Sequence, residues 1–174
     1  MRLFAALELS PAAIQIIHEW REPLIKKHPS IRWIREDQLH VTLRFLGDRE
    51  AHEVIREMKD LSLEELFPIE YTFNRTGTFG KPPAVLWLSG KFSSSLLSIT
   101  HRLDSIPDED NRTGGRRPFI PHVTIARARR GKQCYAFDFD RQITGSFNSL
   151  SLISSRLSAD GPAYSTLFTI SKFH

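Results

Sequence analysis

The 174-residue chain has very little cysteine and no long apolar run, and both absences exclude certain classes of protein. Cys134 is the only cysteine, so an internal disulfide is excluded and a reducing, cytoplasmic setting is expected. No apolar stretch approaches the roughly 20 residues that a membrane-spanning helix needs. The first residues, MRLFAALELSP, hold a brief apolar run interrupted by Glu8, which is not the layout of a signal peptide. We therefore expect a globular protein that does not engage a membrane.

Acidic residues are missing from one long stretch, although the chain as a whole is nearly balanced, with 24 basic and 20 acidic residues. Its 40% hydrophobic and 25% charged content is ordinary for a globular protein, and the length suits a single domain spanning residues 1–174. We expect a monomer. A segment with basic residues only attracts phosphate groups, either in nucleic acid or in a small ligand. The seven basic residues of this segment are Arg112, Arg116, Arg117, Arg127, Arg129, Arg130 and Lys132.

Two short motifs resemble each other across the two halves of the chain. HVTL begins at His40 and HVTI begins at His122, an offset of 82 residues. With the same offset, the apolar run Leu3–Leu7 falls on residues 85–89, and the apolar residues of a helix after Ser10 fall on those of a helix near residues 91–106. We interpret the chain as two similar halves, each built from a strand, a helix and a strand that carries the HVT motif.

The pattern of apolar residues predicts an α+β fold. Ser10 is the expected N-cap of the first helix, which Pro23 ends or kinks, and Asp48 is the expected cap of a second helix. We expect two similar α/β lobes with antiparallel sheets around a central cleft, related by an approximate internal twofold. Strands are predicted at residues 2–9, 39–46, 67–79, 85–89, 133–140, 146–157 and 164–171.

The repeated motif suits acid–base chemistry at phosphorus. Because side chains alternate along a strand, His40 and Thr42 point to one face, about 6–7 Å apart, and His122 and Thr124 do the same in the other half. In-line displacement needs a base beside the attacking oxygen and an acid beside the leaving oxygen, and histidine serves in either role near neutral pH. Threonine hydroxyls can donate to the non-bridging oxygens.

A metal site is the main competing interpretation of these histidines. A catalytic zinc usually has three protein ligands, with carboxylates behind the histidines, but the surroundings of His122 are basic. We therefore expect neither a metal nor another cofactor. The remaining histidines lack ligand spacing and are interpreted as surface residues.

The chain resembles the two-histidine (2H) phosphoesterase superfamily, specifically its LigT-type branch of RNA 2′,3′-cyclic phosphodiesterases, over nearly its full length. The matching segments are RLFAALEL, RWIREDQLHVTLRFLG, FGKPPAVLWL, RPFIPHVTIAR and a degenerate ending that includes Gly161, Pro162 and Tyr164. The resemblance implies the bilobal 2H phosphoesterase fold. It also implies a metal-independent hydrolase that converts 2′,3′-cyclic phosphate ends of RNA into 2′-phosphates, and an associated reversible 2′–5′ RNA ligase activity.

The resemblance also implies roles for individual residues. His40 would be the proton donor and His122 the proton acceptor, although the near-symmetric motifs alone do not distinguish this assignment from its reverse. Arg127 matches a substrate-contacting arginine, but strict alternation places it on the face opposite His122 unless the strand bulges near Ala126. Phe4 matches an aromatic position that stacks on a base or packs in the core. Phe45, Trp33 and Trp87 are assigned to packing. Two alternatives remain open: a phosphodiesterase for another cyclic or 2′–5′-linked nucleotide, and a non-catalytic binder of RNA ends or nucleotides.

Overall fold

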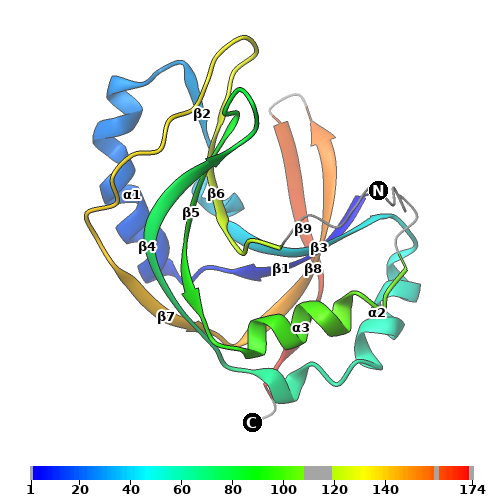
Figure 1. The fold of residues 1–174 in the computed structure, drawn as a ribbon. Helices are drawn as coiled ribbons and strands as arrows, with labels where there is room; N and C mark the ends of the chain where they lie inside the picture. Colours follow the sequence, from blue (N-terminus) through cyan, green and yellow to red (C-terminus); the bar gives the residue numbers. More distant parts are fainter. Residues whose placement is uncertain (1, 108–118, 159–160, 173–174) are drawn as a thin grey trace.

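A single, strongly curled antiparallel sheet forms the centre of the molecule (Figure 1). This computed structural model describes residues 2–107, 119–158 and 161–172. Within them, nine strands form one sheet in the order β7-β4-β5-β6-β3-β1-β8-β9, and β2 pairs with β6 beside this path. The strands are β1 (Arg2–Glu8), β2 (Ile31–Trp33), β3 (His40–Asp48), β4 (Ile69–Phe79), β5 (Val85–Phe92), β6 (Val123–Ala128), β7 (Ile143–Phe147), β8 (Ser149–Ser158) and β9 (Gly161–Ser171).

The helices lie on the outer side of the curl (Figure 1). The helix α1 lies beside β7, whereas α2 and α3 lie on the other side of the molecule, where α3 packs against β3 and α2 approaches β9. None of the helices in the described ranges is long and apolar enough to cross a membrane. The helices are α1 (Pro11–Lys27), α2 (Ala51–Lys59) and α3 (Ser95–Leu103), and two short 3-10 helices are η1 (Glu36–Gln38) and η2 (Glu64–Leu66).

The predicted α+β class with antiparallel pairing and an internal repeat is confirmed. The strand order is symmetric about its centre: β5 and β6 on one side of the β6–β3 contact match β1 and β3 on the other. The two predicted sheets are joined into one by a contact between the motif strands, in which Val41 and Val123 are partners. The cleft therefore lies along the concave face of one continuous sheet.

The repeat is not free of gaps, and the constant offset of 82 is wrong for the first strand of each half. Leu7 pairs with Val41 in the β1–β3 ladder, and Leu88 pairs with Val123 in the β5–β6 ladder. The motif strands differ by 82 residues, but these two leucines differ by 81. A shift of one residue exchanges the two faces of a strand. The offset of 81 matches Leu7 with Leu88, and both side chains are buried in the core at 0% exposure.

The predicted strand at 133–140 is wrong, because this segment has no strand pairing. Its backbone is held by other partners. The Trp20 Nε1–H donates to the Asp138 carbonyl at 2.9 Å, and the Thr76 hydroxyl donates to the Phe137 carbonyl. The Cys134 N–H donates to the Pro83 carbonyl at 3.0 Å. These contacts satisfy backbone groups that a neighbouring strand would otherwise pair.

The first helix begins as predicted but ends later. The Ser10 hydroxyl accepts a hydrogen bond from the Ala13 N–H at 3.2 Å, which is the expected N-cap. The helix does not end at Pro23 and continues to Lys27. Burial of Trp20 and Arg21 on its inner face, at 6% and 4% exposure, secures the turn that precedes the proline.

The other two helices are shorter than predicted. Asp48 is the last residue of β3 rather than a cap, and Glu50 is the N-cap of α2. The helix predicted at 91–106 begins only at Ser95, since β5 extends to Phe92. In both places the strand continues further than predicted, because its ladder partner continues beside it.

Candidate active site

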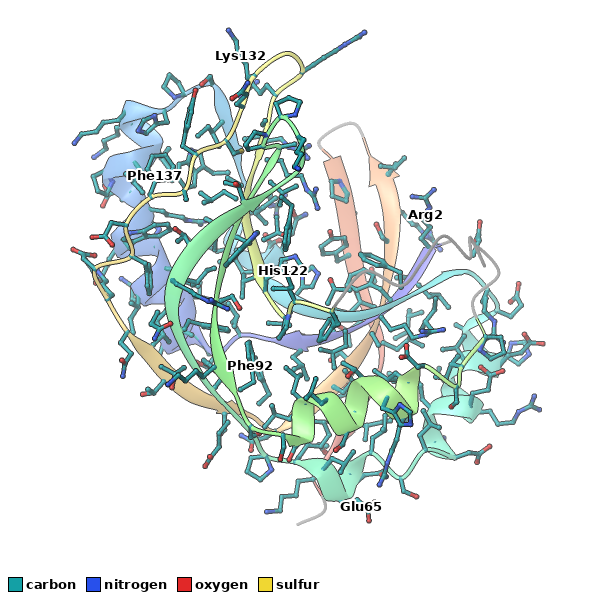
Figure 2. All side chains as sticks on the ribbon, in the orientation of Figure 1. Arg2, Glu65, Phe92, His122, Lys132 and Phe137 are labelled. Carbon is teal, nitrogen blue, oxygen red and sulfur yellow. The ribbon has the colours of Figure 1, made fainter. Side chains whose placement is uncertain are left out.

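The two HVT motifs meet at the centre of the sheet. Val41 and Val123 are partners, and both side chains are completely buried in the core. Because side chains alternate along a strand, the residues that flank each valine point to the other, concave face. Figure 2 shows the labelled His122 side chain inside the curl of the sheet. The structure therefore brings the four predicted polar residues, His40, Thr42, His122 and Thr124, together around one strand contact.

Both histidine rings are fixed in the same way. The Nδ1 of His40 lies 2.7 Å from the Gln38 carbonyl, and the Nδ1 of His122 lies 2.7 Å from the Ile120 carbonyl. A carbonyl oxygen only accepts, so each Nδ1 carries a hydrogen and each neutral ring keeps its Nε2 as the basic atom. In each half, the carbonyl two residues before the histidine binds Nδ1 and leaves Nε2 as the reactive nitrogen.

Ring contacts also hold each histidine. The His40 ring lies 5.1 Å from that of Phe4 and 5.5 Å from that of Tyr164, between centroids. The His122 ring meets Phe79 edge-on at 4.9 Å. In addition, the Thr42 hydroxyl lies 3.0 Å from the His40 Nε2. These contacts limit rotation of both rings, which favours a defined position for each Nε2.

The pKa of both imidazoles is lowered from the ordinary histidine value. For His40, burial is the main cause of the lower pKa, the positive charges at His122 and Arg127 lower it further, and Glu8 opposes them. For His122, burial again lowers the pKa most, and Arg127 adds to the effect. The two halves of the site are thus electrostatically coupled, as expected for motif strands that are neighbours in one sheet. A bound phosphate would raise both pKa values, since an anion favours the charged imidazolium.

A β-bulge follows each HVT motif at the same position. In β3, Leu43 has no partner on β1, because Thr42 pairs with Ala6 and Arg44 with Ala5. One extra residue on a strand exchanges the faces of all residues beyond it. The equivalent bulge in β6 lies at Ile125, between the Thr124–Trp87 and Ala126–Leu86 pairs.

The bulges decide which later side chains reach the cleft. Beyond the bulge in β6, Arg127 shares the concave face with His122, so the condition for Arg127 to contact substrate is met. Beyond the bulge in β3, Phe45 takes the equivalent place. Its side chain is 71% exposed, so its assignment to packing is wrong. Phe4 is only 4% exposed and lies beneath the His40 ring, in a small cluster with Ala6, Ile153 and Tyr164.

Positive charge gathers on the same face beyond the bulge. Arg32 on β2 is the direct cross-strand partner of Arg127, and both side chains are exposed. Like charges directly opposite each other repel, so this pair favours an anion between or above the guanidinium groups. Arg129, Arg130 and Lys132 are also exposed, whereas Arg112, Arg116 and Arg117 lie outside the described residues.

A pocket of about 220 Å³ opens beside His40. Its apolar wall includes Leu39, Ile153 and Tyr164, and its polar wall includes Glu8. No group of three or more His, Cys, Asp or Glu side chains suited to hold a metal ion occurs among residues 2–107, 119–158 and 161–172.

Similar proteins share the family and the fold of this chain. A family model described as the 2′-5′ RNA ligase superfamily matches residues 9–156. An RNA 2′,3′-cyclic phosphodiesterase of Aquifex aeolicus is 28% identical over 151 residues, which is 78% of this chain and 79% of that protein. Among solved structures, a Thermus thermophilus protein superposes with a TM-score of 0.78 at 25% identity, covering 98% of this chain and 97% of the other. The LigT protein of E. coli in its apo form superposes with a TM-score of 0.71 at 24% identity, covering 99% of this chain and 98% of the other.

Proposed function

Because the chain belongs to the 2′-5′ RNA ligase superfamily, we propose that it is an RNA 2′,3′-cyclic phosphodiesterase that opens cyclic phosphate ends to 2′-phosphates without a metal. The observation that carries the proposal is the matched pair of histidines. His40 and His122 each donate from Nδ1 to a carbonyl two residues earlier and offer Nε2 to the same face of the sheet. Two imidazoles held alike around one strand contact provide a proton acceptor and a proton donor for a single phosphate between them.

The proposed reaction moves one proton at each end of the phosphate. Neutral His122 takes a proton from water at Nε2, and the water oxygen forms a bond to phosphorus. The bond from phosphorus to the 3′ oxygen breaks, and protonated His40 gives its Nε2 proton to that oxygen. The product is a 3′-hydroxyl with a phosphate on the 2′ oxygen. The hydroxyls of Thr42 and Thr124 donate to the non-bridging oxygens, where negative charge resides.

The same chemistry accounts for a 2′–5′ ligase activity. If a 5′-hydroxyl of a second RNA replaces water, the attack on phosphorus joins the two RNAs through a 2′–5′ linkage, and no nucleotide cofactor is consumed. The reverse reaction cleaves that linkage, with the two histidines in exchanged roles. Hydrolysis is the main proposed outcome, since water is always present at high concentration.

The positive charge beyond the bulge supports an RNA end, rather than a free cyclic nucleotide, as the substrate. Arg127 lies on the concave face of β6, the strand that follows His122, and Arg32 on β2 is its cross-strand partner. A cyclic mononucleotide has one phosphate, which the histidines and threonines occupy. A longer RNA also has a phosphodiester to neutralise the two guanidinium groups. We propose that the whole chain, residues 1–174, acts as one domain in this reaction.

The experiment that tests the proposal measures hydrolysis of a short RNA with a 2′,3′-cyclic phosphate end, in the presence of EDTA. We expect turnover by the unchanged protein and a loss of about 10²–10⁴-fold in His40→Ala and in His122→Ala, the usual contribution of a general acid or base. His101→Ala on the exposed surface of α3 is the matched control and should retain full activity. Full activity in either motif variant would refute the two-histidine mechanism, and activity abolished by EDTA would refute a metal-free reaction.

A further inference from the structure

The two histidine motifs are nearly identical, so any difference between proton donor and proton acceptor must come from their surroundings. In the β1–β3 ladder, Glu8 is the direct cross-strand partner of His40. Side chains of such partners share a face, with their Cβ atoms about 4.5–5.5 Å apart. Glu8 and His40 also line the same pocket of about 220 Å³. The Glu8 carboxylate therefore stands beside the His40 imidazole at the edge of the cleft.

The other half of the molecule has no such carboxylate at the equivalent position. Leu7 and Leu88 occupy equivalent places in the two ladders, so the residue that corresponds to Glu8 is Ser89. Ser89 is only 1% exposed, and its hydroxyl donates to the Pro121 carbonyl at 2.5 Å. Its hydrogen is thus used to hold the backbone that leads into His122. The approximate twofold is broken at this position by one negative charge.

We propose that Glu8 is the positioning residue that makes His40, rather than His122, the proton donor of the reaction. The inference rests on the proposed function and deepens it. A carboxylate opposite His40 stabilises the imidazolium, which must carry the proton for the 3′ oxygen. Arg127 lowers the pKa of both histidines, so the difference between them lies in the carboxylate opposite His40 and the neutral serine at the equivalent position beside His122. Without a facing carboxylate, the neutral form of His122 is favoured, and it accepts a proton from water.

The other charged and titratable groups near His40 do not replace Glu8. Glu36 is paired with His18 at 2.6 Å and with Arg21 at 3.2 Å. Asp37 is paired with Arg35 at 2.7 Å. Within residues 2–107, 119–158 and 161–172, Glu8 has no salt-bridge partner. The groups that face His40 are Glu8 from β1, Glu36 and Asp37 from η1, His122 just before β6, Arg127 from β6, and Tyr164 from β9.

The test is the pH dependence of kcat/KM in Glu8→Gln, a variant that keeps the shape of the side chain and removes its charge. Removal of the carboxylate lowers the pKa of His40 further, so the basic limb of the bell-shaped profile should move to lower pH. The acidic limb, which reports deprotonation of His122, should stay in place. At pH values above the optimum, kcat/KM should fall about two- to fivefold, the size expected for a partly exposed pair of charges. Glu8→Asp should restore part of the loss.

Asp37→Asn is the matched control, because Asp37 lines the same pocket but is paired with Arg35. Its profile should match that of the unchanged protein. The proposal would be overturned if Glu8→Gln left both limbs in place, or if it moved the acidic limb instead, since His40 would then be the base.

A second measurement separates this inference from the proposed function. Titration of the His40 ring, followed by NMR without substrate, should show a lower pKa in Glu8→Gln, even in a protein that turns over none of the substrates offered. An unchanged His40 titration would refute the role of Glu8. Absence of hydrolysis with a shifted titration would refute the proposed function alone.

Discussion

Phe45 is the exposed aromatic on the concave face, and its replacement by alanine separates a role in binding from a role in packing. The side chain is 71% exposed, so less than a third of its surface is removed from water. A fully buried phenylalanine removes about 200 Å² from water. A third of that area, at about 25 cal/mol per Å², limits the loss of folding free energy in Phe45→Ala to about 1.5 kcal/mol.

The expected loss in substrate binding is of similar size or larger. Stacking of a base on an aromatic side chain contributes about 1–3 kcal/mol, which corresponds to an increase of about 5- to 150-fold in KM. KM should therefore rise for a cyclic-ended RNA, and kcat should change little, because Phe45 contacts neither proton that moves. Steady-state kinetics and urea unfolding of the same preparation measure the two effects separately.

Two variants calibrate the result. Leu97→Ala removes an apolar side chain of similar exposure, 64%, on α3 outside the cleft, and should leave KM unchanged. Phe73→Ala removes a side chain that is 0% exposed and should cost about 3–5 kcal/mol of stability. An unchanged KM in Phe45→Ala, combined with a stability loss as large as that of Phe73→Ala, would refute a role of Phe45 in substrate binding.

Three further outcomes follow from the structure. Arg32→Gln should raise KM severalfold for a cyclic-ended oligonucleotide but not for a cyclic mononucleotide. Arg35→Gln is the control, because Arg35 is paired with Asp37. Equal effects of Arg32→Gln on both substrates would contradict a site for a second phosphate. The lowered pKa values of His40 and His122 mean that the unfolded chain binds more protons, so the melting temperature should fall as the pH drops below about 6.5, and it should fall less in a variant lacking both histidines. Trp20→Phe removes the hydrogen bond to the Asp138 carbonyl and should cost about 1 kcal/mol while accelerating hydrogen exchange in residues 133–142; unchanged exchange would show that other contacts hold this segment.

The sequence predicted the features that depend on local pattern. Alternation along a strand placed His40 with Thr42, and His122 with Thr124, on common faces. The N-cap at Ser10 was predicted by the chemistry of its hydroxyl, which accepts from the first turn of α1. The repeat of the motif predicted that both copies contribute to one site.

Features that depend on register between strands were not accessible from the sequence. The bulges at Leu43 and Ile125 are defined by pairing with β1 and β5, and the residue types at these two positions do not predict a bulge. They turn Phe45 and Arg127 to the concave face, against the simple alternation. The only sequence signal for Phe45 was its position, equivalent to that of Arg127.

The strand predicted at 133–140 failed for a related reason. The segment contains alternating aromatic residues that suit a half-buried strand. In the fold, however, the free edge beyond β4 is taken by β7, which pairs from Ile143 to Phe147. The preceding segment is left to cover α1 and the β4–β5 hairpin through Trp20, Thr76 and Pro83. Competition between segments for one sheet edge is not visible in local pattern.

We propose that two histidines, without a metal, open a 2′,3′-cyclic phosphate by protonation of the 3′ oxygen. The most direct measurement is the identity of the product after incubation of a cyclic-ended RNA with the protein in EDTA, read by ³¹P NMR against 2′- and 3′-phosphate standards. We expect a 2′-phosphate as the only product, absent with His40→Ala. A 3′-phosphate, or a cyclic end left intact by the unchanged protein, would contradict the claim.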